Sequence, residues 1–577
     1  MIQYFNINDN GEFNMSVNLR EKPFYLNDED ILWVEKNISE MTIEEKIWQL
    51  FSPIVFLSEE NQLKEFITNK KVGGILYREG KGVEIRNCHK VLQDNSKIPL
   101  LLSSNLEQGG TGSAIEGTFY GKQLEVAASG NSKRAYELGL VAGREGDAVG
   151  VNLALAPVID IDKNFRNPIT NIRTYGDDAD RVLEFGKKYV QGAREAGMAV
   201  TIKHFPGDGI DERDQHLLTS VNDLTCEEWD ASFGKIYSSF IDDGIRCIMV
   251  GHIALPAYEE KFDGEKCEKI IPTSLSRNVL QNLLRKQMGY NGLVITDATP
   301  MVGFCAAMER EKAVPLSIEY GCDMFLFNKD LDEDFGFMMK GYESGLLSEE
   351  RLMDALTRIL GFKAAIGLAK KQAENMLIPS EEALKILKIK EHEEMAKGCA
   401  DEAVTLVKDT QNLLPITPLR HKRILLEILG DFPSNDRVYG QFENLLTDAG
   451  FEVTKYIPET FGMHMDTVTE FKSKYDLVIY IGNIDNASNK TVTRINWHTF
   501  FGLGNNMPWF VEEVPAMFIS VGNPYMLMDA PMIKTYINGY CNTPYVIDAA
   551  VEKILGKSEF KGINPVDPFC GRVDTRY

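Results

Sequence analysis

Residues 198–216 read MAVTIKHFPGDGIDERDQH, and this stretch combines the two features that decide the fold. It opens with a short apolar run that ends at Ile202. It continues into a loop that contains two glycines, a proline and eight ionisable side chains. A loop crowded with charge directly after a buried strand is typical of the carboxyl edge of a parallel sheet, where functional groups collect.

The same succession of apolar run and polar loop occurs eight times before residue 330. The runs are 49–56, 74–77, 98–103, 151–157, 198–203, 247–252, 292–296 and 322–327. Helical patterns such as 132–150, 178–196 and 226–243 separate them. Eight strands alternating with helices predict a parallel α/β architecture, and eight strands close a (β/α)8 TIM-type barrel. A doubly wound open sheet would also place polar residues after its strands, so that alternative stays open.

The chain has 577 residues, which is more than one hydrophobic core usually holds (about 250–300). New strand-like runs at 404–407, 423–429, 476–481 and 516–521 follow a charged, helical stretch. We therefore predict a catalytic barrel domain over residues 1–375, a helical linker over 376–397, and a smaller C-terminal α/β/α sandwich domain over 398–577.

Composition excludes several classes of partner. The formal net charge of −23 disfavours binding to nucleic acid or to an anionic membrane. The nine cysteines form no CxxC pair, which indicates reduced thiols. The N-terminus lacks the pattern of a signal peptide, and no apolar run is long enough to span a bilayer. We expect a soluble, cytoplasmic monomer or homo-oligomer; Trp497 and His498 could reach another subunit, although a buried aromatic is the simpler interpretation.

The loop at 203–216 offers groups for proton transfer. Asp214 and His216 are two residues apart, so the carboxylate can hold one imidazole nitrogen while the other donates a proton. Asp297 follows another apolar run, where a carboxylate can attack a sugar carbon, although capping of the next helix is the simpler role. No metal-binding spacing such as HExxH occurs, so neither a metal nor a cofactor is expected.

These residues resemble glycoside hydrolase family 3, and in particular its β-N-acetylglucosaminidase branch. The resemblance rests on KHFPG at 203–207, on Asp-x-His at 214–216, on APVID at 156–160, on RTYGD at 173–177, and on Thr-Asp at 296–297. These motifs cover most of residues 40–370 in the family's order. The NLLPI segment at 412–416 and the GNPY segment at 522–525 resemble the family's second domain.

The resemblance implies a retaining, exo-acting β-N-acetylhexosaminidase that takes a small carbohydrate as its substrate. Asp297 would form a covalent glycosyl-enzyme, and His216, oriented by Asp214, would act as the acid and then as the base. The residues expected to hold the sugar are Asn105, Glu107, Asp160, Arg173, Lys203, His204 and His252. A neutral imidazole does not repel an anion, so a β-N-acetylglucosaminide phosphorylase is an alternative.

Two departures from the family pattern bear on the substrate. Asp208 stands where the family usually has His. Residues 105–111, NLEQGGT, replace the usual Asp-x-Glu-Gly-Gly-Arg segment with one extra residue and without the arginine. A β-glycosidase for another sugar such as glucose therefore stays an alternative, as does a sugar-binding homologue without activity.

Overall fold

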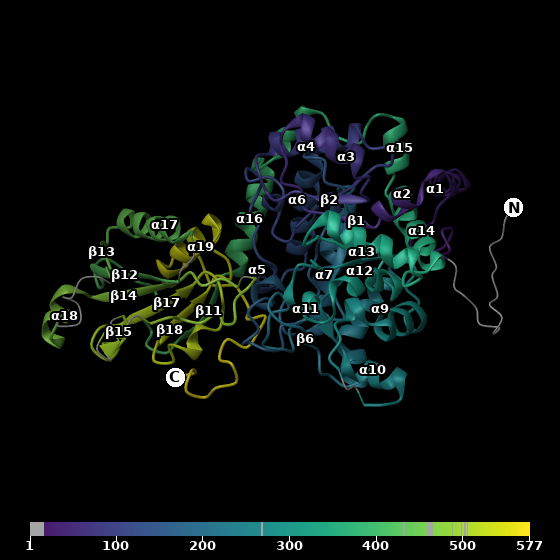
Figure 1. Cartoon of the computed structure of the whole chain (residues 1–577). Coiled ribbons are helices and arrows are strands. Elements are labelled where there is room, and N and C mark those ends of the chain that lie inside the picture. Colours follow the sequence, from purple (N-terminus) through teal and green to yellow (C-terminus); the bar gives the residue numbers. More distant parts are fainter. Residues whose placement is uncertain are drawn as a thin grey trace. The chain divides into compact units, whose positions relative to one another are not determined.

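The computed structural model describes residues 17–266, 269–430, 433–457, 466–486, 488–497, 499–500, 503–504 and 506–577. The chain divides into two compact units, each made of several segments. The first contains residues 1–118, 139–160 and 189–389, and the second contains residues 119–138, 161–188 and 390–577. Figure 1 shows the order of the elements in each unit.

Each of the eight apolar runs overlaps a strand. The strands are β1 (Phe51–Ser52), β2 (Gly74–Leu76), β3 (Leu101–Ser104), β4 (Leu153–Ala154), β5 (Ala199–Phe205), β7 (Cys247–Val250), β9 (Leu293–Thr296) and β10 (Phe325–Leu326). Six of them form one parallel sheet in the order β2-β3-β4-β5-β7-β9, and β1 pairs with β10 separately. Single bridges link Ile54 to Leu76 and Ile295 to Met324. The prediction is thus confirmed as an α/β unit with a parallel sheet, while the complete barrel stays a proposal.

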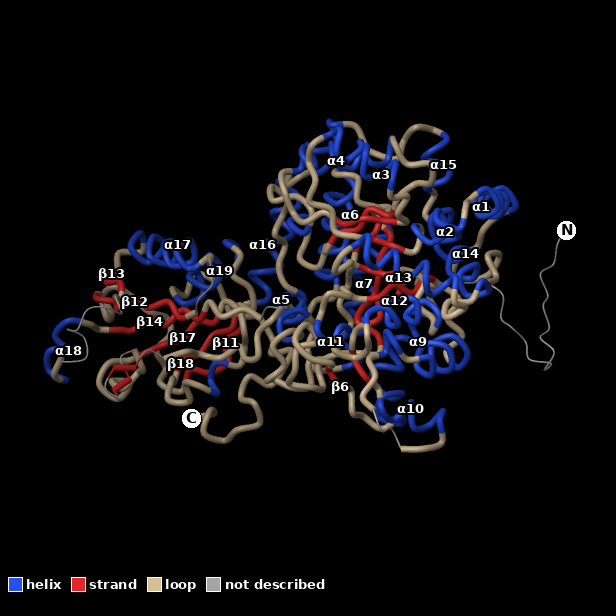
Figure 2. The backbone as a smooth tube through the Cα atoms, viewed as in Figure 1, coloured by secondary structure: helices blue, strands red, loops and turns tan. Residues whose placement is uncertain are grey.

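In the first unit two helices precede β1 and further helices follow the strands along the chain, and Figure 2 shows helices around the strands. They are α1 (Asp28–Glu40), α2 (Ile43–Trp48), α3 (Glu60–Asn69), α4 (Gly82–Asp94), α8 (Cys226–Trp229), α9 (Lys235–Asp242), α10 (Pro256–Asp263), α11 (Val302–Cys305), α12 (Arg310–Glu319), α13 (Leu331–Glu343), α14 (Glu349–Ala365) and α15 (Leu368–Ala373). Two more, α6 (Lys133–Ala148) and α7 (Ala179–Glu195), begin in segments of the second unit. The helix expected over 226–243 contains a π-helical turn at Asp230–Gly234.

The second unit is built on a six-stranded sheet in the order β11-β18-β17-β14-β12-β13. Its strands are β11 (Thr405–Asp409), β12 (Arg423–Leu429), β13 (Glu452–Lys455), β14 (Leu477–Gly482), β17 (Ala516–Ser520) and β18 (Thr535–Asn538), and only β11 runs antiparallel to its neighbour. Alternate residues of β12 enter different cores, since Ile424 belongs to one cluster and Leu425 to the other. Burial on both faces agrees with the predicted sandwich.

Helices of the second unit include α5 (Gln123–Ala128), α16 (Lys390–Ala403), α17 (Asn435–Asp448), α18 (Val468–Lys474) and α19 (Pro544–Ile554). Figure 1 shows α17 and α19 along one side of the strands, where their apolar residues join the cluster around Ile424. The other cluster contains Trp497, which is partly buried and donates a hydrogen bond to the Asp529 carbonyl. His498 lies outside the described residues.

The second unit takes in two segments that precede residue 375. Leu124 and Ile172, from these segments, share a buried cluster with Ala403 and Tyr540. This shared apolar core is the physical reason why the segments group with the C-terminal part of the chain. The division after Ile389 falls within the predicted linker, and the boundaries 1–375, 376–397 and 398–577 stay predictions.

No helix among the described residues is both long and apolar enough to cross a membrane. The cytoplasmic location and the oligomeric state stay predictions. Eight cysteines are described, and each is a free thiol. Cys267 lies outside the described residues.

Lys363 is an unusual buried cation in the first unit. It lies in α14 with no exposed surface, and its ammonium donates a hydrogen bond to the Gln49 side-chain carbonyl at 2.8 Å. Burial lowers the pKa of Lys363 from 10.5 to about 7. Between these values the unfolded chain binds more protons than the folded chain, so this group makes the fold more stable as pH rises from 7 towards 10.

We predict that a Lys363→Met variant loses this dependence. The free energy of unfolding of the wild type should rise relative to that of the variant by about 1.4 kcal/mol per pH unit between pH 7.5 and pH 9.5. Urea unfolding at several pH values measures the difference. Lys36→Met, at an exposed position on α1, is the control and should show the wild-type slope. Equal slopes for the wild type and Lys363→Met would contradict the prediction.

Candidate active site

The end of β5 carries two of the predicted binding residues. His204 is buried, and its Nδ1 lies 2.7 Å from Asp160 Oδ2. The backbone N–H groups of His204 and Asp208 also donate to Asp160 Oδ1, at 3.1 and 2.8 Å. Asp160 therefore fixes both the ring of His204 and the turn that follows the strand. The Nε2 atom of His204 lies 3.9 Å from Asp297 Oδ2, which brings these three predicted residues together.

Lys203 and Glu107 form a second contact between predicted residues. Lys203 Nζ lies 2.7 Å from Glu107 Oε1, and their side chains are 4% and 19% exposed. Glu107 follows β3 and Lys203 lies on β5, which are separated in the sheet only by β4. Asn105, the first residue after β3, is half-buried. The partly open carboxylate and amide can donate or accept hydrogen bonds, as a neutral polyol requires.

Asp214 and His216 are hydrogen-bonded to each other. His216 Nδ1 lies 2.7 Å from Asp214 Oδ1, which also accepts from the His216 backbone N–H at 2.9 Å. The Asp214 carboxylate is fully buried, whereas the His216 side chain is 25% exposed. The carboxylate thus selects the tautomer with a proton on Nδ1 when the ring is neutral, and Nε2 is then a proton acceptor.

Asp297 lies at the end of β9 among three histidines. Burial alone would raise its pKa, but the positive charges that His204, His252 and His216 can carry, together with the Ala298 N–H, lower the pKa of Asp297 below 3.8. The Ala298 N–H donates to Asp297 Oδ1 at 2.7 Å. A carboxylate held ionised in this way is suited to attack as a nucleophile.

His252 is engaged by the protein at both ring nitrogens. Nδ1 lies 2.8 Å from Ser274 Oγ, and Nε2 lies 3.0 Å from the Ala298 carbonyl. Burial lowers the pKa of His252, and the charge of Asp297 opposes this shift only in part. With a proton on Nε2, the ring donates a hydrogen bond to the Ala298 carbonyl. These contacts indicate that His252 positions the loop that contains Asp297. The predicted contact between His252 and sugar stays a prediction.

The family model of the glycosyl hydrolase family 3 N-terminal domain matches residues 42–362. The chain belongs to glycosyl hydrolase family 3. A β-N-acetylglucosaminidase/β-glucosidase from Cellulomonas fimi is 41% identical over 568 residues, which are 97% of this chain and 100% of that protein.

Solved structures agree with this membership. The β-glucoside phosphorylase BglX with bound 2FGlc is 40% identical and has a TM-score of 0.91, over 96% of this chain and 99% of the other. A family 3 β-N-acetylglucosaminidase from Paenibacillus sp. str. FPU-7 is 23% identical with a TM-score of 0.76, over 92% of this chain and all of the other. The second likeness supports the fold alone. The chain is thus a family 3 glycoside hydrolase.

Within this family 3 chain, Arg173 belongs to the second unit. It ends the 3-10 turn Asn171–Arg173, and its Nη1 donates to the Ile169 carbonyl at 3.5 Å. Asp162 anchors this segment by accepting from Thr170 Oγ1 at 2.8 Å and from Tyr525 Oη at 2.6 Å. Burial raises the pKa of Asp162 to about 6 although these bonds oppose the shift. The predicted contact of Arg173 with the sugar stays a prediction.

The glycines of residues 105–118 serve close packing. A Cβ added at Gly110 would lie 1.9 Å from Oε2 of Glu145, a fully buried carboxylate that accepts from the Thr118 N–H and hydroxyl. A Cβ at Gly112 would lie 1.8 Å from the Asn105 carbonyl oxygen. The absence of side chains at these positions therefore lets the loop fold over Glu145 and Asn105.

Two residues without a predicted role connect the parts of the site. Gln215 Oε1 accepts from the His252 N–H at 2.7 Å, and its amide donates to Asp208 Oδ2 at 3.4 Å. Glu145 lies on α6, far along the chain from the loop it supports. The middle position of the Asp-x-His motif could have indicated Gln215, whereas no local pattern indicates Glu145. No group of three or more His, Cys, Asp or Glu among the described residues is arranged to hold a metal ion.

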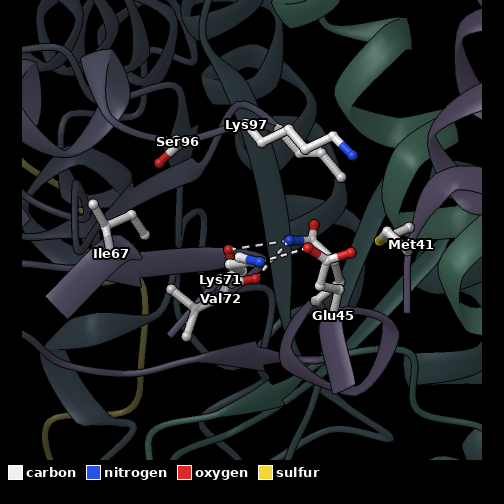
Figure 3. Close-up of a pocket in the computed structure, with 9 residues that line it drawn as sticks. Met41, Glu45, Ile67, Lys71, Val72, Ser96 and Lys97 are labelled. Atoms are coloured by element: carbon white, nitrogen blue, oxygen red, sulfur yellow. Dashed lines mark hydrogen bonds and ion pairs between the residues drawn. The ribbon is translucent and has the colours of Figure 1, made fainter. Parts of the chain in front are cut away.

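Figure 3 shows a pocket elsewhere in the first unit, with Glu45 and Lys71 directed toward each other among its lining residues. The lining residues Lys71 and Val72 precede β2, and Ser96 and Lys97 precede β3. The predicted catalytic residues instead follow the carboxyl ends of the strands. This pocket therefore belongs to the amino edge of the sheet, which in folds of this class serves stability.

We predict that Gly112→Ala impairs substrate binding. The new methyl group would displace the Asn105 backbone, which follows β3 directly, so KM should rise and kcat/KM should fall roughly tenfold, because a 1 Å misplacement costs up to about a hundredfold. Steady-state kinetics with a β-glycoside that the wild type cleaves measure KM and kcat/KM. Gly336→Ala is the matched control, since a Cβ there meets nothing within 4 Å. Unchanged kinetics in Gly112→Ala would show that Asn105 needs no such support.

Proposed function

We propose that this protein is a retaining, exo-acting β-glycosidase that removes a terminal β-linked N-acetylglucosamine or glucose. The observation that carries the proposal is the 2.7 Å contact between His216 and Asp214, on a loop whose His216 carbonyl accepts from the N–H of Val302, the first residue of α11. This contact couples a proton donor to the neighbourhood of an ionised carboxylate. These two sugars are proposed because the relative from Cellulomonas fimi is named a β-N-acetylglucosaminidase/β-glucosidase.

In the proposed reaction, Asp297 attacks the anomeric carbon while His216 Nε2 gives its proton to the departing oxygen. His216 must be protonated at both nitrogens at this point, and Asp214 stabilises the imidazolium through the Nδ1–H. The neutral imidazole then takes a proton from the incoming water, whose oxygen attacks the anomeric carbon, so that the bond to Asp297 breaks and the sugar and the Asp297 carboxylate are released. Two displacements at the same carbon return the β configuration.

The sugar would be held by the groups around Asp297. His204 Nε2 faces the nucleophile while Asp160 fixes the ring through Nδ1. Glu107, Asn105 and Lys203 would supply hydrogen-bond partners for hydroxyl groups. These assignments follow the family motifs and stay part of the proposal.

A second candidate function is phosphorolysis, with phosphate in place of water as the acceptor. Two observations favour it: the base is an imidazole, and the β-glucoside phosphorylase BglX is 40% identical over almost the whole chain. A neutral imidazole lets a phosphate dianion approach, whereas a carboxylate base would repel it. The product would then be a sugar 1-phosphate.

We also propose that the pair β1–β10 completes an eight-stranded (β/α)8 barrel with the six-stranded sheet. The bridges between Ile54 and Leu76 and between Ile295 and Met324 support this, because they join the pair to β2 and to β9, the two edges of the sheet. Pro53 follows β1 and has no backbone N–H, so it cannot donate the hydrogen bond that would lengthen the pairing of β1.

The proposal predicts turnover of 4-nitrophenyl β-glycosides of N-acetylglucosamine or glucose. Asp297→Ala should abolish release of 4-nitrophenol, and His216→Ala should lower kcat/KM about 10²- to 10⁴-fold on an alkyl glycoside, with a smaller loss on the 4-nitrophenyl glycoside because that leaving group needs less protonation. Addition of phosphate separates the two candidates, since only phosphorolysis yields a sugar 1-phosphate. NMR of the first product reports the retained configuration.

Asp223→Ala is the matched control, because Asp223 is an exposed carboxylate seven residues after His216. It should keep the wild-type rate. Turnover that survives in Asp297→Ala, or a first product of inverted configuration, would contradict the proposed mechanism.

A further inference from the structure

Two exposed apolar side chains lie close to His216, one in the loop that follows it and one at the start of α11. Leu218 follows His216 by two residues and is 51% exposed, and Val302 is 42% exposed. Single exposed apolar residues are ordinary on a protein surface. Leu218 and Val302 differ from other exposed apolar residues because they lie beside the proposed acid/base residue, where a bound substrate could contact them.

The loop at residues 215–219 and the start of α11 at residues 302–303 are hydrogen-bonded to each other, and we call these two segments the ledge. The Val302 N–H donates to the His216 carbonyl at 3.0 Å, and the Gly303 N–H donates to the Gln215 carbonyl at 3.2 Å. Thr219 Oγ1 donates to the Gly303 carbonyl at 3.1 Å. Leu218 and Val302 are therefore held in one surface by bonds that do not involve their side chains.

We expect the ledge on the aglycone side of the proposed site. On the proposed function, His216 Nε2 must approach the oxygen that links the sugar to its leaving group. The atoms beyond that oxygen are then the ones that meet residues next to His216. On the sugar side, the groups near Asp297 are charged or polar, as in the contact between Lys203 and Glu107. The sugar side of the site is therefore polar, whereas the surface with Leu218 and Val302 is more apolar.

We propose that Leu218 and Val302 form the binding surface for an apolar aglycone, so that the substrates are β-glycosides of alkyl or aryl alcohols. This inference rests on the proposed function and adds the class of leaving group. Burial of each methylene of the aglycone lowers the free energy of the bound substrate, which raises kcat/KM through KM. A second sugar as the leaving group would gain little from these side chains.

A series of alkyl β-glycosides tests the inference, because methyl, propyl and hexyl alcohols differ in apolar surface and little in leaving-group acidity. We expect kcat/KM of the wild type to rise roughly twofold per methylene, about half of the fourfold expected for complete burial. In the double variant Leu218→Gln/Val302→Thr the hexyl-to-methyl ratio should fall from roughly thirtyfold to below about fivefold on the same scale. Leu32→Gln, at a 63% exposed leucine on α1, should keep the wild-type ratio.

The outcomes separate the two proposals. A wild type that cleaves no β-glycoside would overturn the proposed function and this inference with it. Turnover with equal kcat/KM along the series, or with preference for a disaccharide over the hexyl glycoside, would overturn only the apolar aglycone surface. A double variant with the wild-type ratio would do the same. Thermal unfolding of each variant shows whether a change in ratio reflects loss of folded protein.

Discussion

The candidate site depends on the Asp160 carboxylate, which is buried and accepts three hydrogen bonds from residues 204 and 208. Two of the donors are backbone N–H groups, so the carboxylate fixes the path of the chain as it leaves β5. The third is the ring of His204, whose opposite nitrogen faces Asp297. One buried anion thus sets the turn, orients an imidazole, and lets that imidazole act on the pKa of the nucleophile. A buried charge is tolerated only when it is bonded in this way.

The electrostatics of the site follow from the unequal burial of its histidines. His252 lies wholly inside and makes hydrogen bonds to Ser274 and Ala298, so it supports the Asp297 loop. His216 is partly open to solvent and has one nitrogen held by Asp214, which leaves the other for exchange of protons. Histidine therefore has a structural role at position 252 and a proton-transfer role at position 216, and the degree of burial decides between the two roles.

Much of this arrangement could be predicted from sequence, because buried parallel strands are short apolar runs and their carboxyl ends carry polar residues. All eight such runs overlap strands, and of the residues predicted after them His204 lies near Asp297 while Lys203 pairs with Glu107. The edge strand β13 was missed because its side chains are mostly exposed and polar, and β18 because its run of four residues is short. Glu145 could not be found, since it supports a loop more than 25 residues away in sequence through a contact that only the fold creates.

The interleaving of the two units limits how this chain could have changed during evolution. Residues 119–138 and 161–188 leave the first unit and contribute Leu124 and Ile172 to the core of the second. A cut near Ile389 would strip that core from both segments and expose their apolar faces, although every proposed catalytic residue lies before the cut. The second unit therefore cannot be exchanged as one continuous piece of chain, because two segments before Ile389 belong to its core.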